Sequence, residues 1–421
     1  MPAAAPDIRV RQPLALRALN RAGGLLAGAG LPLVRLDPDG LCARASRRTG
    51  LDDFGDDAFR EPLRRLLHSM EHEAALTLLG RLIARTDVVR LLENRLRMTD
   101  VRRRHPEIDA QEIRRPLFIV GLPRTGTTIL HELMAQDPEN RVPMTWEVMH
   151  VWPPPERATY ESDPRIAAVD KHFAGVDRLI PGFQSMHPMG ARLPQECVAL
   201  TAHDFASMLF STTHRVPAYH DWLDGTDLRW VYASHRRQLQ YLQWRCPGER
   251  WVLKSPGHLW ALDALLAVYP DAAIVQTHRD PLRVVASLAS LVALLRRLAS
   301  DRVDRAAIGA EWTARLAAGL ERSMAVRTGA DARADGRILD VHFADFMRDQ
   351  VGTVRRIYEH CGLRLSADAE TRMRRFLAAN PDDKHGRHRY TLAAAGLDPA
   401  TERRRYAAYQ ERFGIPSEPI E

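Results

Sequence analysis

The chain has 421 residues, more than one minimal domain needs, and its 45% hydrophobic and 27% charged residues are typical of a globular protein with a sizeable core. Its net charge of +7 favours an anionic ligand, but the same charge fits nucleic acid or a membrane surface. Four widely spaced cysteines form no C-x-x-C pair, and arginines interrupt the N-terminus where a signal peptide would be apolar, so we expect a cytoplasmic protein.

Residues 1–112 are predicted to form a helical N-terminal extension. Leucines and valines recur there at three- and four-residue spacing, which is typical of amphipathic helices, and the segment carries no evident chemistry. The apolar run 23–34 contains a proline and is shorter than the roughly 20 residues that cross a bilayer. At most a peripheral membrane contact is therefore expected.

Residues 113–398 are predicted to form an α/β domain. A buried strand at 117–121 leads through a glycine-containing loop into a helix at 127–136. This alternation predicts a central parallel sheet flanked by helices, with ligands at the carboxyl ends of the strands. Residues 145–245 are interpreted as a helical lid insertion that binds substrate, and residues 399–421 as a C-terminal helical tail. Further strands are predicted at 251–254, 272–278 and 337–343, with helices at 258–269, 281–295 and 344–363.

The loop at 120–128, VGLPRTGTT, has almost the spacing of a nucleotide-triphosphate loop. From Gly121 it runs G-x-x-x-x-G-T-T, so Thr127 stands where such a loop has lysine. Backbone N–H groups at the helix start would cradle an anion, and Arg124 and Thr128 add further donors. The strand ending QTHRDP (276–281) places arginine before the aspartate, which gives weak support for Mg²⁺-dependent triphosphate chemistry.

Together with LKSP (253–256) and THRDPLRVVAS (277–287), this loop resembles the PAPS-dependent sulfotransferase family. PAPS is 3′-phosphoadenosine 5′-phosphosulfate. The resemblance covers residues 115–295, and residues 380–397 are also similar to bacterial members. It implies a P-loop-like sulfotransferase fold, PAPS as co-substrate, adenosine 3′,5′-bisphosphate as product, and no required metal.

The resemblance also implies how PAPS is bound. The strand-end arginine and a serine eight residues later, Arg279 and Ser287, would bind the 3′-phosphate, although an internal Arg279–Asp280 salt bridge is the alternative. A C-terminal basic loop would close on the same phosphate, but its residues also fit a solvated charge run. The 5′-phosphosulfate loop would be Arg124, Thr125, Gly126, Thr127 and Thr128, and the basic loop Lys384, Arg387 and Arg389.

Lys254 is a notable residue because the chain has only three lysines among its 60 basic residues. In the tyrosyl-protein branch of the family, the lysine of a similar stretch is catalytic, so the resemblance implies that Lys254 and Arg124 stabilise charge as the sulfonate leaves. A glutamate placed like Glu147 is the base in that branch. His187 and Glu196 are rivals, and either would otherwise orient the acceptor.

The acceptor is a hydroxyl on a small molecule, glycan or lipid, and the sequence does not identify it. Trp146 and Phe183 are candidates for lining its pocket, although both also fit a core. A nucleotide-dependent kinase with a degenerate P-loop and a non-catalytic polyanion-binding protein remain as alternatives. No nucleic-acid-binding signature is evident, and the oligomeric state is open.

Overall fold

The computed structural model describes residues 13–181, 183, 188–328, 336–380 and 391–420. Within these residues the core is a five-stranded parallel sheet of order β2-β3-β1-β4-β5. Because all strands are parallel, their carboxyl ends share one edge, and the central position of β1 sets the loop that follows it between the ends of β3 and β4. The strands are β1 Leu117–Gly121, β2 Asn140–Arg141, β3 Arg250–Lys254, β4 Ala273–His278 and β5 Ile338–His342.

The sheet is buried on both faces, as the apolar strand sequences predict. Alternate residues of β1 enter different hydrophobic clusters, with Phe118 and Val120 in one and Leu117 and Ile119 in the other. Successive side chains of a strand point to opposite faces, so a continuously apolar strand is stable only between two helical layers. The face that carries Leu117 and Ile119 packs against three helices, α5 Thr127–Met134, α17 Gln350–His360 and α18 Ala367–Ala379.

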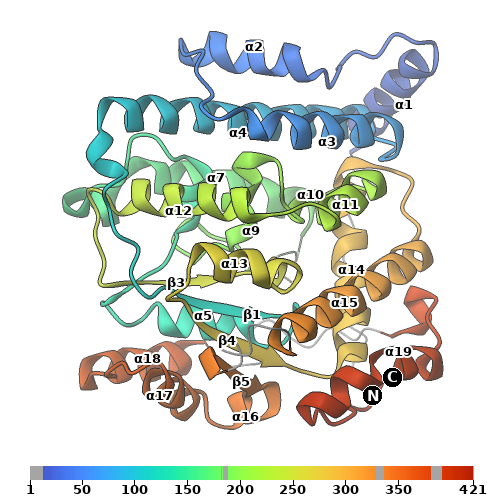
Figure 1. Ribbon diagram of the computed structural model, residues 1–421. Coiled ribbons are helices and arrows are strands. Elements are labelled where there is room, and N and C mark those ends of the chain that lie inside the picture. The colour runs from blue at the N-terminus through green and yellow to red at the C-terminus, as the bar shows by residue number, and fades with distance from the viewer. Residues whose placement is uncertain (1–12, 182, 184–187, 329–335, 381–390, 421) are drawn as a thin grey trace.

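The N-terminal helices lie farthest from the sheet and rest on the insertion helices (Figure 1). One cluster joins the two layers, since Phe59 and Leu92 pack in it with Phe205 and Tyr219. The N-terminal helices are α1 Leu14–Gly28, α2 Pro38–Thr49, α3 Arg60–His72 and α4 Leu78–Arg104. The insertion contains α6 Thr145–Met149, α7 Pro164–Leu179, α9 Cys197–Thr201, α10 Leu209–Thr213, α11 Pro217–Asp224 and α12 Arg229–Gln243.

The remaining helices follow β3, β4 and β5 along the chain. The predicted α/β fold class is confirmed. The two helices predicted at 258–269 and 344–363 are, however, each divided in two. A 3₁₀ turn at Pro256–Ala261 precedes α13, and Asp349 separates α16 from α17 by capping the second helix through Gly352 N (2.8 Å). The helices are α13 Leu262–Val268, α14 Pro281–Ala299, α15 Arg305–Thr328, α16 Phe343–Arg348 and α19 Pro399–Phe413.

No helix among the described residues is both long enough and apolar enough to cross a membrane.

Candidate active site

The loop between β1 and α5 is held in a conformation that requires its glycines. Gly121 has φ of 147°, and a Cβ there would lie 2.2 Å from Thr277 Oγ1. Gly126 caps α5 with φ of 86°, in the left-handed region that favours glycine. Thr125 is 1% exposed, donates to Leu122 O (2.7 Å) and lies 2.6 Å from the Thr277 hydroxyl. The Thr125 side chain therefore ties the loop to β4.

The first turn of α5 faces the carboxyl ends of the strands. The first N–H groups of a helix have no carbonyl partner within it, and Gly126 has no side chain to supply one. The helix dipole adds partial positive charge at the same place. Thr127 is buried and Thr128 is exposed. The anion site that the loop sequence predicts at this turn stays a prediction, and these N–H groups are the donors that would form it.

Lys254 ends β3 beside this turn, and it joins the loop to the insertion. Its side chain is 3% exposed, Nζ lies 3.3 Å from Thr128 Oγ1, and the same nitrogen forms an ion pair with Glu196, the N-cap residue of α9. Beneath it, burial and then the charge of Lys254 lower the pKa of His131 to about 3. His131 is therefore neutral, and Lys254 is the cation that meets the loop and the carboxylate here.

Arg279 follows β4 on the other side of the loop. Its Nη1 donates to the Arg124 carbonyl (3.0 Å), and its guanidinium lies 4.0 Å from the centre of the Phe343 ring. Its Nε and Nη2 contact both carboxylate oxygens of Glu418, at 2.8 and 2.9 Å. The C-terminal segment thus places an anion on the residue expected to bind the 3′-phosphate. Ser287, eight residues later on α14, is 6% exposed.

The alternative of an Arg279–Asp280 salt bridge is not what the structure contains. Asp280 instead accepts from Leu282 N (3.0 Å), which caps α14, and it pairs with Arg403 Nη1 (2.7 Å) on α19. It also accepts from the backbone N–H of Glu418 (2.7 Å). Asp280 therefore anchors the C-terminal segment, while Arg279 faces the loop.

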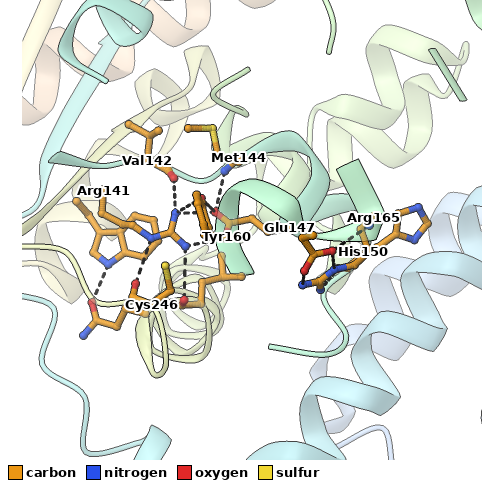
Figure 2. A network of polar contacts seen from close by, with 12 residues as sticks. Arg141, Val142, Met144, Glu147, His150, Tyr160, Arg165 and Cys246 are labelled. Atoms are coloured by element: carbon orange, nitrogen blue, oxygen red, sulfur yellow. Dashed lines mark hydrogen bonds and ion pairs between the residues drawn. The ribbon is translucent and has the colours of Figure 1, made fainter. Parts of the chain in front are cut away.

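Glu147 pairs with Arg141, the last residue of the edge strand β2. It is 0% exposed, and its two oxygens pair with Nη1 and Nη2 of Arg141 at 2.7 and 2.6 Å (Figure 2). Met144 N (2.8 Å) and the Tyr160 hydroxyl (3.4 Å) also donate to it. A carboxylate with this burial and these partners is a structural group. The geometry argues against the base role predicted for Glu147.

The other predicted residues fall into two groups. Trp146 is 1% exposed and packs with Ile166 and Val169, and Phe183 is 3% exposed and packs with Ile180, so both belong to small hydrophobic clusters. They fit the core alternative. The remaining predicted residues lie outside the described residues, and they are His187, Lys384, Arg387 and Arg389.

Sequence reasoning missed two residues that contact Arg279. Phe343 directly follows β5, the strand next to β4, so its position after a strand end was an available signal. Glu418 is 139 residues from Arg279 and lies in a terminal stretch without motif, so no local pattern marks it.

Comparison with known proteins agrees with this geometry. The model of the family described as "Sulfotransferase family" matches residues 116–367. The solved structure of sulfotransferase STF1 from Mycobacterium tuberculosis H37Rv is 37% identical, with a TM-score of 0.78 over 88% of this chain and 98% of that one. Sulfotransferase STF9 from Mycobacterium avium is 30% identical, with a TM-score of 0.83 over 90% and 97%. The chain belongs to the sulfotransferase family.

A curated relative carries a more specific name. The omega-hydroxy-beta-dihydromenaquinone-9 sulfotransferase Stf3 of Mycobacterium bovis is 26% identical over 295 residues, which are 66% of this chain and 70% of the relative. The matched family region includes the loop, Lys254, Arg279 and Ser287, so the family resemblance seen in these motifs is confirmed.

Proposed function

We propose that the chain transfers a sulfonate group from PAPS to the hydroxyl of an acceptor by in-line displacement. The observation that carries the proposal is the position of Lys254, which contacts Thr128 in the loop and Glu196 in the insertion. A phosphosulfate loop, a buried cation and a carboxylate thus meet at the carboxyl ends of β1 and β3. Such a site supplies positioning and charge stabilisation, which is what transfer of an anionic group needs.

In the proposed reaction Glu196 takes the proton of the acceptor hydroxyl. The hydroxyl oxygen forms a bond to sulfur while the bond between sulfur and the oxygen of the 5′-phosphate breaks. Adenosine 3′,5′-bisphosphate leaves with that electron pair. Lys254, Arg124 and the first N–H groups of α5 stabilise the negative charge that develops on the leaving oxygen.

We assign the base to Glu196 instead of Glu147. The Glu196 side chain is 22% exposed and contacts Lys254, whereas Glu147 is enclosed with Arg141. A general base must reach the proton it removes, within roughly 2.6–3.2 Å of the donor atom or through one water. Glu196 lies beside Lys254, which is where we propose that the acceptor meets the loop.

For the 3′-phosphate we propose Arg279, with Ser287 as a second donor. The Glu418 carboxylate engages Arg279 through two oxygens, which is the pairing that a phosphate makes with a guanidinium. Phe343 stacks on the same guanidinium and fixes its orientation. Arg279 is therefore already held in a position suited to an anion.

For the acceptor we propose a hydroxyl carried by an apolar, lipid-like group. A cavity beside the reaction centre is lined by Cys197 and Ser255, the neighbours of Glu196 and Lys254 in the chain. Apolar side chains cover much of its wall, among them Val198, Met208, Leu223, Leu228 and Val231. The name of the Mycobacterium bovis relative, a menaquinone derivative sulfotransferase, supports the same class of acceptor.

The test is a screen with labelled PAPS over long-chain alcohols, prenols, phenols and sugars, with product masses measured. Lys254→Ala is expected to lower transfer by about 10²–10³-fold while binding of adenosine 3′,5′-bisphosphate, measured by calorimetry, persists. Lys171→Ala, which removes an exposed lysine of α7, is the matched control and should leave transfer unchanged.

Three outcomes would contradict parts of the proposal. Failure of the parent protein to bind adenosine 3′,5′-bisphosphate rejects the donor. Full activity in Lys254→Ala rejects the assigned centre. Bisphosphate binding without transfer to any acceptor class favours the polyanion-binding alternative.

A further inference from the structure

We propose that helix α1 and the segment after it, residues 14–33, dock this protein on the surface of an anionic lipid bilayer. The proposal begins with where exposed leucines lie. Among the described residues seven large hydrophobic side chains are exposed, and six of them belong to this segment. They are Leu14 (81%), Leu19 (48%), Leu25 (79%), Leu26 (38%), Leu31 (64%) and Leu33 (60%).

Helix α1 contacts the rest of the protein through its small and polar residues. Asn20 is 6% exposed and accepts a hydrogen bond from Leu79 N (3.0 Å) at the start of α4. Gly23 lies so close that a Cβ there would be 2.7 Å from Leu78 Cβ. These two contacts fix the rotation of α1 about its axis, and that rotation turns its leucines outward.

A soluble helix normally buries its apolar side and exposes its polar side, so α1 has the reverse arrangement. Exposed apolar surface of this extent is uncommon on a monomer and marks an interaction site. Helix α1 also lies on the outer side of α4, far from the sheet (Figure 1). A partner that covers these leucines therefore reaches them without obstructing the candidate active site.

Charge identifies the partner. Between residues 13 and 36 the sequence contains Arg17, Arg21 and Arg35, all exposed, and no aspartate or glutamate. A second copy of the chain would bring another face of the same sign against this one. An anionic bilayer supplies both an apolar phase for the leucines and negative headgroups for the arginines.

The length of α1 sets how it would lie. Its 15 residues are fewer than the roughly 20 that cross a bilayer, so it fits the interface plane with its leucines in the acyl boundary. The inference does not depend on the proposed reaction. If the acceptor is lipid-like, however, the same surface places the enzyme where such an acceptor is found.

The experiment is co-sedimentation of the full chain with vesicles of phosphatidylcholine alone and with 30% phosphatidylglycerol added. We expect binding to the anionic vesicles that weakens as salt rises, because salt screens the arginines. The variant Leu14→Ser/Leu25→Ser/Leu31→Ser should bind about a thousandfold more weakly, at about tenfold for each leucine. Trp152→Ser, which alters the exposed large hydrophobic side chain outside the segment, should bind like the parent.

Several results would overturn the proposal. The proposal fails if the triple variant binds anionic vesicles as tightly as the parent, or if the parent binds neither vesicle. A parent dimer in analytical ultracentrifugation that the triple variant loses would assign the leucines to a second copy. Thermal melting verifies that all variants are folded, and because the substituted leucines are exposed we expect unchanged melting temperatures.

Discussion

Two glutamates of the insertion, Glu147 and Glu196, are each paired with a cation and have opposite surroundings. Glu147 pairs with Arg141 through both oxygens and is fully buried, while Glu196 pairs with Lys254 and keeps 22% of its side chain exposed. The first pair closes a network with Tyr160, whereas the second lies beside Thr128 in the loop. The two carboxylates thus differ in what their cations contact, and this difference is why the proposed base is Glu196 and not Glu147.

The largest expected effect comes from Glu196→Gln, which keeps the shape of the side chain and removes the base. We expect kcat per folded molecule to fall by about 10²–10⁴-fold, the usual contribution of a positioned base. Steady-state kinetics with labelled PAPS measure this change. Normal turnover in Glu196→Gln would show that Glu196 is not the base.

The opposite pattern is expected for Glu147→Gln. Loss of its charge leaves Arg141 buried without a counter-ion, and breaking such a pair costs about 3–5 kcal/mol of unfolding free energy. Chemical denaturation measures this cost, and kcat per folded molecule should stay near that of the parent. In Arg141→Met/Glu147→Leu both charges are gone, so part of the stability should return.

If Glu147→Gln were stable and inactive, the two glutamates would exchange roles. The structural pair would then be the catalytic one, and the geometry of Figure 2 would have to open during turnover.

The sequence predicted the loop, Lys254 and Arg279 better than it predicted the proposed acceptor side of the candidate site. Strands at 117–121, 251–254 and 272–278 are short apolar runs, and parallel pairing forces the loop, Lys254 and Arg279 to one edge. This placement follows from local pattern and sheet geometry alone. The five-strand order also needed β2, whose two residues give no periodic signal.

The proposed base was harder to predict because its role depends on contacts between distant segments. Glu147 is 6 residues from Arg141, yet nothing in the sequence shows that the Arg141 guanidinium lies against the rings of Tyr160 and Trp251. Glu196 reaches Lys254 across 58 residues. Such pairings are set by how the insertion packs on the sheet, which single-sequence patterns do not encode.

A smaller effect concerns pH and the histidine beneath the Lys254 pair. Burial and then Lys254 hold the pKa of His131 near 3, below the 6.5 of an unfolded histidine. Because the folded pKa of His131 is depressed, the stability that the protein has with His131 neutral is fully present above pH 6.5. That stability is lost as the pH falls toward about 3. Each such histidine costs about 1.4 kcal/mol per pH unit in that window.

His131→Gln keeps a donor for the Val252 carbonyl and removes the titration. We expect a shallower fall in unfolding free energy between pH 6.5 and 4 for the variant than for the parent, measured by denaturant titrations. Other buried histidines, such as His203 and His235, retain part of the slope in both proteins. An identical slope in parent and variant would place the His131 pKa near its usual value.

The smallest expected effect tests whether the C-terminal segment competes with adenosine 3′,5′-bisphosphate for Arg279. This prediction rests on the proposed role of Arg279 in binding the 3′-phosphate. Glu418→Gln removes the carboxylate from a half-buried pair whose worth is about 0.5–1 kcal/mol. Adenosine 3′,5′-bisphosphate should then bind about two- to fivefold more tightly by calorimetry. Glu411→Gln, at an exposed glutamate of α19, makes the same charge change and should have no effect.

Combining Glu418→Gln with Arg279→Ala separates competition between Glu418 and the bisphosphate from a general effect of charge. Arg279→Ala alone should weaken bisphosphate binding by about tenfold or more, since a charge-assisted contact is lost. In that background Glu418→Gln should no longer change the affinity, because the residue it competes for is absent. If Glu418→Gln instead weakens binding in the parent, the segment holds Arg279 in place for the nucleotide and does not compete with it.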